Sequence, residues 1–255
     1  MRYDAIYLAS STIYKKLSIR HPRIISSITS WKIMKMNKEE REFFIKAPYA
    51  ISVNNNGLLA EVKKVRRDAY YLPNCVDIDI FKPKTSGVFP GKKITIGWTG
   101  NTNRMEKNYN KIMKPVIKKM KDEVSFKLIK TKKGTVDSEY RDSISMKEYY
   151  HGIDFYLNVS SSEGTPNPCL EAASCGVPLI STPVGNMPDL IKQDINGLFI
   201  EDSVKSAVMG VRWATKIDSA KYKEMSSSLR NIVEKQWSID SRRETILGFF
   251  SKVRK

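Results

Sequence analysis

The sequence predicts an α/β protein built from two domains, each with a parallel β-sheet. Short runs rich in Val, Ile, Tyr and Phe alternate with longer amphipathic segments in both halves of the chain. Such alternation is typical of parallel sheets whose two faces are covered by helices. A segment rich in Pro, Gly and Lys, residues 82–93, has no periodicity and is predicted to be the linker between the two halves.

The first half of the chain gives an N-terminal domain over residues 1–81. Its strands are β-branched or aromatic runs, predicted at residues 3–9, 23–28, 48–53 and 69–73. Its helices are predicted between them, at residues 11–20, 37–46 and 56–66.

The second half gives a larger domain over residues 94–236, followed by a last helical segment over 237–255. Its strands are predicted at residues 94–98, 124–129, 153–159, 177–181 and 197–200. Its helices are predicted at residues 106–121, 145–151, 167–175, 187–193, 203–216, 218–235 and 238–252. Within the first of these helices, Pro115 is predicted either to bend the helix or to mark its first turn.

Composition excludes several classes of protein. A chain of 255 residues with 41% hydrophobic content is ordinary for a soluble globular protein, which argues against a disordered or fibrous one. No apolar run approaches the roughly 20 residues that cross a bilayer, and the N-terminus lacks the pattern of a signal peptide. We therefore expect a cytoplasmic protein, with peripheral attachment to a membrane left open.

The cysteines and histidines carry little chemical signal. Cys75, Cys169 and Cys175 form no CxxC pair, so we expect three reduced thiols and no structural zinc. His21 and His151 are the only histidines, and neither stands at metal-ligand spacing from another ligand. The sequence therefore predicts no metal site.

The net charge of +17 is unevenly distributed along the chain. Residues 1–150 hold 31 basic and 15 acidic residues, whereas residues 151–200 hold one basic and five acidic residues. A chain this basic accumulates on polyanions such as nucleic acid or an anionic membrane. A solvated lysine-rich surface is the alternative interpretation. The first candidates for contact with a polyanion are five lysines of the predicted helix, Lys111, Lys114, Lys118, Lys119 and Lys121.

The segment most informative about chemistry is residues 160–202. It contains two carboxylates, Glu163 and Glu171, separated by seven residues that form a Gly-Thr-Pro-Asn-Pro loop and the start of a helix. A loop that leads into a helix presents N–H groups and the positive end of a helix dipole, which stabilise phosphate. Eight steps at 1.5 Å span about 12 Å, so the two carboxylates could grip both ends of one nucleotide-sugar.

An isolated pair of this kind would carry no chemical signal, because Glu163 could be an ordinary loop carboxylate and Glu171 a solvated helix residue. Here the pair follows a predicted buried strand and precedes a helix of small residues. That helix is predicted to end at Gly176 in the left-handed conformation. This context favours the functional interpretation of the two carboxylates.

These residues resemble the group 1, or family 4, retaining glycosyltransferases, whose pattern reads approximately E-G-x-P-x-x-x-L-E-A-x-A-x-G-x-P-V-I. The positions in register are Glu163, Gly164, Pro166, Leu170, Glu171, Ala172, Ser174, Gly176, Pro178, Leu179 and Ile180. The match continues through Gly185, Asp189, Asn196, Gly197 and Leu198, with Asp189 standing where the family usually has Glu. The resemblance implies a GT-B arrangement of two Rossmann-like domains.

The resemblance also implies roles for individual residues. Glu163 is expected to contact the transferred sugar, and Glu171 to hold the ribose hydroxyls. The donor phosphates are expected to meet the loop between these two carboxylates, which comprises Gly164, Thr165, Pro166 and Asn167.

The resemblance extends upstream of the pair. Residues 71–83 look like the family's domain junction, with Cys75 in place of the customary Gly. Residues 96–108 look like the strand and loop that serve the donor diphosphate, with Gly100, Lys107 and, less well placed, Arg104. Two cations there would neutralise the leaving charge as the glycosidic bond breaks, although both could instead cap the next helix.

The resemblance therefore implies a retaining, metal-independent glycosyltransferase, and we expect its co-substrate to be a UDP- or GDP-linked sugar, with no other cofactor. Its acceptor is expected to be DNA or an anionic membrane lipid or glycan. The N-terminal domain is expected to be shortened, since family members extend about a hundred residues further upstream. Either the enzyme is naturally minimal and is completed by a partner subunit or second copy, or the sequence is a fragment. The alternative is a non-catalytic subunit that binds sugar nucleotides or nucleic acid and needs a partner for activity.

Overall fold

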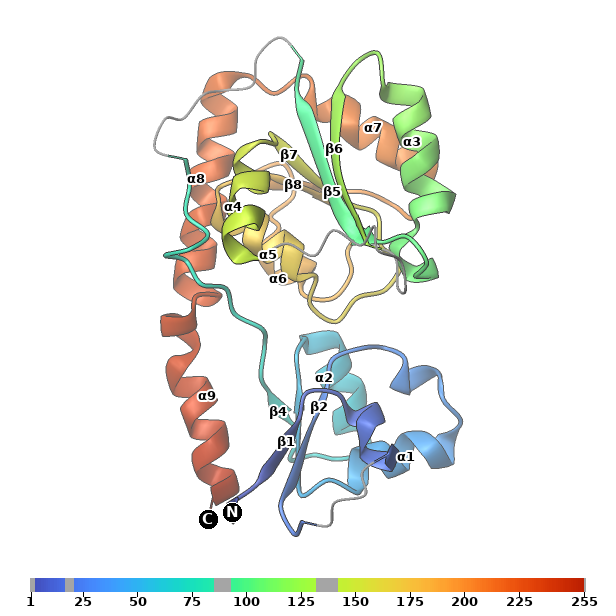
Figure 1. Cartoon of the computed structure of the whole chain (residues 1–255), viewed down its shortest axis with the longest axis vertical. Helices are drawn as coiled ribbons and strands as arrows, with labels where there is room; N and C mark the ends of the chain where they lie inside the picture. The colour runs from blue at the N-terminus through green and yellow to red at the C-terminus, as the bar shows by residue number, and fades with distance from the viewer. Residues whose placement is uncertain (1–2, 17–20, 85–92, 132–141, 255) are drawn as a thin grey trace. The chain divides into compact units, whose positions relative to one another are not determined.

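The structure, a computed structural model, describes residues 3–16, 21–84, 93–131 and 142–254 (Figure 1). The chain divides into two compact units. The first comprises Met1–Asn74, Glu163–Thr165 and Asp240–Lys255, and the second comprises Cys75–Ser162 and Pro166–Ile239. Each unit contains a parallel sheet with helices, so the predicted α/β fold class is confirmed. Most of the predicted linker lies outside the described residues, and the predicted domain limits stay predictions.

The first unit is built on a four-stranded parallel sheet with the order β1-β2-β3-β4. Its strands are β1 (Ile6–Leu8), β2 (Ile24–Ile28), β3 (Ala50–Val53) and β4 (Tyr70–Tyr71). The connections contain the 3₁₀ helices η1 (Ser11–Lys16) and η2 (Ile33–Lys35) and the helices α1 (Lys38–Lys46) and α2 (Asn56–Lys63). The helix predicted at residues 11–20 is thus a 3₁₀ helix as far as residue 16, and residues 17–20 lie outside the described part.

Local chemistry explains where the helices of the first unit begin. The side chains of Asn37 and Asn55 accept the backbone N–H groups of Glu40 and Leu58, each at 2.9 Å, and so cap α1 and α2. The last helix, α9 (Ile239–Arg254), also packs against this sheet, because the ring of Phe249 lies 5.0 Å from that of Tyr70.

The second unit is built on a five-stranded parallel sheet with the order β6-β5-β7-β8-β9. Its strands are β5 (Thr95–Asn101), β6 (Ser125–Thr131), β7 (Phe155–Asn158), β8 (Leu179–Ser181) and β9 (Gly197–Phe199). Its α-helices are α3 (Lys114–Met120), α4 (Ser143–His151), α5 (Asn167–Ser174), α6 (Met187–Leu190), α7 (Val204–Ala214) and α8 (Ser219–Gln236). Every described strand overlaps a run that the sequence predicts to be a strand.

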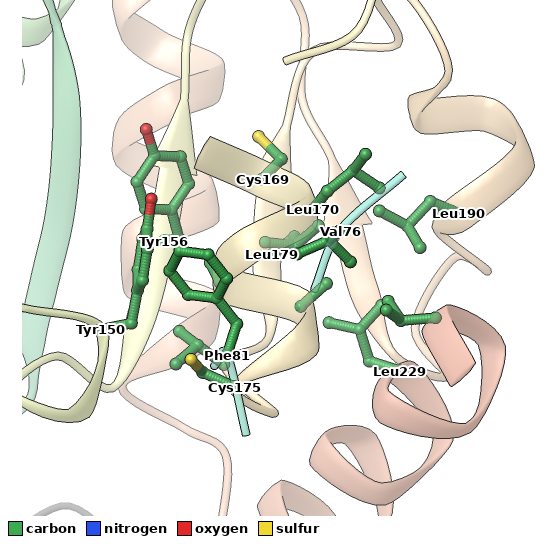
Figure 2. Close-up of a cluster of buried hydrophobic side chains, with 14 of the residues drawn as sticks. Val76, Phe81, Tyr150, Tyr156, Cys169, Leu170, Cys175, Leu179, Leu190 and Leu229 are labelled. Atoms are coloured by element: carbon green, nitrogen blue, oxygen red, sulfur yellow. The ribbon is translucent and has the colours of Figure 1, made fainter. Parts of the chain in front are cut away.

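Alternation along the strands divides the apolar core of this unit between two faces of the sheet. In β7, the side chains of Phe155 and Leu157 join the core formed with α3 and α7, whereas Tyr156 joins the core formed with α4, α5 and α8. Figure 2 shows the second of these cores, where Tyr150 of α4 and Tyr156 lie near Phe81. Helices therefore cover both faces, as expected for a parallel sheet.

The prediction of a single helix at residues 106–121 is wrong. The segment contains a 3₁₀ turn, η3 (Met105–Lys107), a π-helical turn, η4 (Tyr109–Met113), and then α3. Asn108 has φ 51°, a left-handed conformation that interrupts the helix. Pro115 lies in the first turn of α3, the second of its two predicted roles, and the π-helical turn η4 leads directly into that turn.

The apolar stripe of this segment faces the core. Ile112, Met113, Val116 and Met120 are at most 1% exposed and belong to the core shared with α7, so these apolar side chains form a core face. Gly176, with φ 73°, follows α5 in the left-handed conformation that the sequence predicts. The three cysteines are thiols rather than members of disulfides, as predicted.

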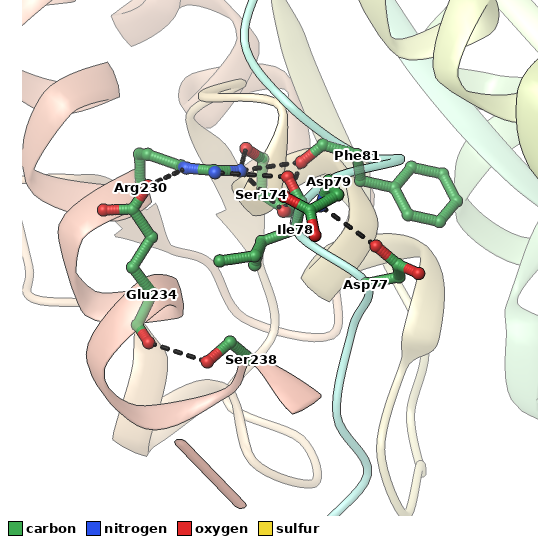
Figure 3. Close-up of polar contacts among 8 residues, drawn as sticks. All are labelled: Asp77, Ile78, Asp79, Phe81, Ser174, Arg230, Glu234 and Ser238. Atoms are coloured by element: carbon green, nitrogen blue, oxygen red, sulfur yellow. Dashed lines mark hydrogen bonds and ion pairs between the residues drawn. The ribbon is translucent and has the colours of Figure 1, made fainter. Parts of the chain in front are cut away.

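One arginine joins three separate stretches of the second unit. The guanidinium of Arg230 on α8 donates to the carbonyl oxygens of Phe81 and Ser174, each at 2.7 Å, and of Ile78 at 3.2 Å (Figure 3). Its Nε lies 2.6 Å from the carboxylate of Glu234. The planar fork of arginine suits several acceptors at once, so Arg230 fixes the extended segment before the second sheet to α5 and α8.

Replacing Arg230 with Ala should lower the free energy of unfolding by about 3 kcal/mol, because the carbonyl oxygens would lose charged donors in a partly buried position. Urea denaturation of the full chain, followed by circular dichroism, measures this change.

The matched control is Arg212→Ala, which removes an exposed pair with Glu123 in the same unit. Exposed pairs contribute less than about 1 kcal/mol. An equal loss of stability in the two variants would contradict the structural role of Arg230.

Candidate functional site

The carboxyl ends of β5 and β7 mark the point where the strand order of the second sheet reverses. The chain continues from β5 to β6 on one side, whereas β7, β8 and β9 follow on the other. Only two residue pairs join β5 to β7, Ile96 with Phe155 and Gly97 with Tyr156. Open α/β sheets bind ligands at such a reversal, outside the carboxyl ends of the strands.

Beyond these pairs a side chain takes the place of the strand ladder. The backbone N–H of Thr99 donates to the hydroxyl oxygen of Tyr156 at 3.2 Å, and the two hydroxyl oxygens lie 2.9 Å apart. Thr99 is 8% exposed, so an unpaired N–H there would be costly. Tyr156 thus satisfies the backbone of β5 without a hydrogen bond from the backbone of β7.

The structure brings two of the predicted site residues together after β5. Gly100 lies in β5, and Lys107 ends the 3₁₀ turn η3. A Cβ atom added to Gly100 would lie 3.4 Å from Cδ of Lys107 and 2.8 Å from the ring of Trp98. The absence of a side chain at position 100 therefore lets the stem of Lys107 approach the backbone of the strand.

Asn108 fixes the same loop to the rest of the sheet edge. Its side-chain Nδ2 donates to the carbonyl oxygen of Val159 and to the carboxylate of Asp202, each at 2.9 Å. Val159 follows β7, and Asp202 follows β9. One buried amide therefore ties the loops after β5, β7 and β9, and the position of the neighbouring Lys107 depends on it.

Arg104 has a different environment from Lys107. Its side chain is 50% exposed, and its Nε lies 3.8 Å from the carboxylate of Glu106. It also lines a shallow pocket of about 380 Å³ with residues 102–105 and 108–111, a set that does not include Lys107. Arg104, unlike Lys107, therefore lines this particular pocket.

Glu163, Gly164 and Thr165 group with the first compact unit. Within that unit, Nδ2 of Asn55 donates to the carbonyl oxygen of Gly164 at 3.2 Å, and the hydroxyl of Thr165 donates to that of Asn54 at 3.2 Å. A Cβ atom on Gly164 would come within 1.9 Å of a backbone oxygen, so a larger residue there would displace the chain. The side chain of Glu163 is partly exposed.

Pro166 and Asn167 belong to the second unit and begin α5. Neither Pro166 nor Pro168 has an N–H group, and the N–H of Cys169 donates to the carbonyl oxygen of Pro166 at 2.9 Å. The start of α5 therefore offers a phosphate fewer backbone N–H groups than a helix start without prolines.

Glu171 lies on α5, and its carboxylate is held from one side. The hydroxyl of Tyr150 donates to Oε2 of Glu171 at 2.7 Å. Burial raises the pKa of the Glu171 carboxyl, and the hydrogen bond from Tyr150 offsets part of that rise. Burial, followed by the charge of Glu171, raises the pKa of Tyr150 well above its usual value, so this hydroxyl stays protonated and donates.

Several polar residues near these strand ends carry no signal in the sequence. Tyr150 and Tyr156 look like ordinary core aromatics, and Asn108 looks like a helix residue. Ser160 and Asn186 follow β7 and β8, and their buried side chains have no hydrogen-bond partner among the described residues. Buried unpaired groups cost about 1–3 kcal/mol each, which makes them candidates for contact with a polar ligand.

Neither a metal centre nor a membrane span is evident in the described ranges. There, no group of three or more His, Cys, Asp or Glu side chains could hold a metal ion. No helix in the same ranges combines the length and the apolar character that crossing a bilayer requires.

Comparison with protein families identifies part of the second unit. Residues 127–213 match the family described as Glycosyl transferases group 1. This match agrees with the resemblance seen in the sequence, and the matched segment contains both Glu163 and Glu171. No curated protein sequence matches the chain.

Solved structures show the fold. Sucrose-phosphate synthase from Thermosynechococcus elongatus is 11% identical, with a TM-score of 0.76 over 98% of this chain and 74% of that one. HepE from Anabaena, in complex with UDP and glucose, is 12% identical, with a TM-score of 0.75 over 98% of this chain and 78% of that one.

A single solved domain also matches part of the chain. The C-terminal domain of LpcC, a group 1 family glycosyltransferase from Francisella tularensis, is 21% identical, with a TM-score of 0.54 over 64% of this chain and 99% of that domain. The fold is therefore that of the GT-B glycosyltransferases, and this part of the prediction is confirmed.

The Glu171→Gln variant should be more stable than the wild type at pH 7. A carboxyl whose pKa is raised in the folded state loses stability as the pH rises from its usual value, 4.5, through the raised value. A neutral amide avoids that loss and can still accept from Tyr150. We expect a melting temperature roughly 2–4 °C higher, the shift that about 1 kcal/mol produces in a protein of this size.

Thermal melts at pH 7 and at pH 4 measure the effect, which should shrink at the lower pH. Glu224→Gln is the control, because that carboxylate is 72% exposed on α8. A Glu171→Gln variant that melts below the wild type at pH 7 would contradict the cost of burying this charge.

Proposed function

We propose that this chain transfers a sugar from a nucleotide-sugar donor to an acceptor, with retention of configuration. The match to the group 1 glycosyltransferase family supports the reaction class. The proposed donor site rests on one observation. Glu171 lies on α5, the helix that follows β7, and its carboxylate accepts a hydrogen bond from Tyr150 of α4. The chain enters this helix from the carboxyl end of β7, the edge at which open α/β sheets bind ligands.

In this proposal Glu171 accepts hydrogen bonds from the ribose, and the start of α5 meets the phosphates. The loop residues Gly164, Thr165, Pro166 and Asn167 complete the phosphate site, and Glu163 contacts the transferred sugar. We propose UDP or GDP as the nucleotide. The structural similarity to HepE, which was solved in complex with UDP and glucose, supports a donor of this kind.

The proposed chemistry needs positive charge where the diphosphate leaves. The bond from the anomeric carbon to the phosphate oxygen breaks, and a bond to the acceptor oxygen forms on the same face of the sugar. The acceptor proton passes to the departing diphosphate. Lys107, held against Gly100, would stabilise the negative charge that develops, and Arg104 would add to it, so the reaction is proposed to proceed without a metal.

The acceptor is proposed to be a polyanion or to lie on an anionic surface. Lys114, Lys118, Lys119 and Lys121 are exposed around α3, opposite the apolar stripe that faces the core. Lys111 is also exposed, and it lies 3.3 Å from the carboxylate of Asp202. The basic side chains therefore form an exposed face, which supports contact with DNA or anionic lipid.

Glu163→Ala should reduce turnover of the donor by roughly 100-fold, because a contact with the reacting sugar acts mainly in the transition state. A panel of UDP- and GDP-sugars, assayed for transfer and for slow hydrolysis, first identifies the donor of the wild-type chain. The variant is then compared with that wild-type rate.

Glu224→Ala is the control, since it removes an exposed carboxylate of α8. Equal turnover by Glu163→Ala and wild type would contradict the proposed sugar contact. Binding of the donor by the wild type without any turnover would favour the alternative, a sugar-nucleotide-binding subunit that needs a partner.

A triple variant in which Lys114, Lys118 and Lys119 are each changed to Glu should bind the polyanion roughly 10-fold more weakly or worse. The salt dependence of its binding should also be smaller. Gel shifts with DNA and sedimentation with vesicles of anionic lipid, each across a range of salt, identify which polyanion is bound.

The control carries the same charge change at exposed lysines elsewhere in the second unit, Lys216, Lys223 and Lys235. If both triple variants lose affinity equally, the α3 surface has no special role and net charge alone governs binding.

A further inference from the structure

A buried tyrosine holds the carboxylate of Glu171 through a hydrogen bond. The hydroxyl of Tyr150 lies 2.7 Å from its Oε2, and among the described residues Tyr150 is the one hydrogen-bond partner of this carboxylate. The side chain of Glu171 is partly exposed, while Tyr150 is 0% exposed. One oxygen of the carboxylate is therefore engaged from within the core.

The ring of Tyr150 is itself fixed by other aromatic side chains. Its centroid lies 6.0 Å from that of Phe81 and 6.2 Å from that of Tyr156, and Figure 2 shows these three side chains. It also lies 5.2 Å from the centroid of Tyr149, and all three ring pairs have edge-to-face geometry. Edge-to-face packing on several sides leaves the ring little freedom to turn. The hydroxyl therefore has a set position, and Glu171 is oriented by a rigid donor rather than by a flexible one.

A carboxylate held in this way has a defined direction for its second oxygen. A free glutamate side chain loses rotational entropy when it binds a ligand, whereas a restrained one has already lost part of it. A ribose presents two neighbouring hydroxyls, each a hydrogen-bond donor. A deoxyribose lacks one of them, so an oriented carboxylate can distinguish the two sugars.

We propose that Tyr150 is a positioning residue, which orients Glu171 toward the ribose and makes the site prefer ribonucleotides to 2′-deoxyribonucleotides. This inference rests on the proposed function, because it assumes that Glu171 meets the ribose of the donor. It adds a residue that acts through Glu171 and a property of the nucleotide, its 2′-hydroxyl, on which binding depends.

Binding of UDP, GDP and their 2′-deoxy forms to the full chain, measured by calorimetry, tests the proposal. The wild type should bind one ribonucleotide roughly 10-fold more tightly than its deoxy form. Tyr150→Phe, which removes one hydroxyl, should weaken ribonucleotide binding by about 10-fold and bring the two forms close together. Combined with Glu171→Gln, it should have no further effect, since the hydroxyl acts only through that carboxylate.

The pH dependence gives a second measurement that packing alone would not change. The hydrogen bond from Tyr150 lowers the pKa of Glu171, so its loss should raise that pKa. Binding that needs the ionised carboxylate should then appear at higher pH in Tyr150→Phe than in the wild type.

Tyr149→Phe is the matched control. It removes a neighbouring hydroxyl that donates to the carbonyl oxygen of Lys127 and not to Glu171. It should keep the wild-type preference and pH profile. If Tyr150→Phe does not fold, Glu171→Asp keeps Tyr150 but withdraws the carboxylate from it, and the same loss of preference is expected.

The outcomes separate this inference from the proposed function. If Glu171→Gln abolishes the ribose preference but Tyr150→Phe and Glu171→Asp retain it with an unchanged pH profile, the role of Tyr150 is wrong and the donor site stands. If the wild-type chain binds none of the four nucleotides, the proposed function is wrong, and this inference fails with it.

Discussion

The arrangement of the second unit depends on how β5 and β7 separate at their carboxyl ends. The two strands share only two residue pairs. Further along β5, the backbone N–H of Thr99 donates instead to the hydroxyl of Tyr156. Without this hydrogen bond, a buried backbone donor would be left unpaired at a cost of about 1–3 kcal/mol. The hydrogen bond from Thr99 to Tyr156 therefore allows β5 and β7 to separate at this point. The side chain of Asn108 then connects the loops that follow the two strands.

Stability and function place opposite demands on Glu171. A carboxylate that is largely withdrawn from water costs free energy in the folded chain, which the raised pKa expresses. A glutamine would fold at least as well. The carboxylate is nevertheless the stronger acceptor for hydroxyl groups, so the proposed contact with a ribose would account for its cost. The rest of the unit offsets that cost through its core and through tethers such as Arg230.

Much of the fold could be predicted from the sequence, because it depends on local patterns. Short β-branched and aromatic runs indicated the strands, amphipathic segments indicated most helices, and Gly176 marked the end of α5 correctly. The prediction of one helix at 106–121 was wrong because Asn108 is left-handed. Its side chain is held by residues distant in the sequence, such as Asp202, which a local pattern does not show. Nor does the sequence show that residues 163–165 pack with the first unit although their chain neighbours belong to the second.

The candidate site was predictable to the extent that it follows a motif, and unpredictable where it depends on side chains from the core. Three tyrosines show why. Tyr149, Tyr150 and Tyr156 bury their rings in one apolar cluster, where phenylalanine would fill the same space. Their hydroxyls reach a different element each, β6 through Lys127, α5 through Glu171 and β5 through Thr99. A buried hydroxyl must find a partner, so each ring fixes the element that supplies it. The core of this unit therefore does more than exclude water, since its polar tips set the positions of the strand and helix from which the proposed donor site is built.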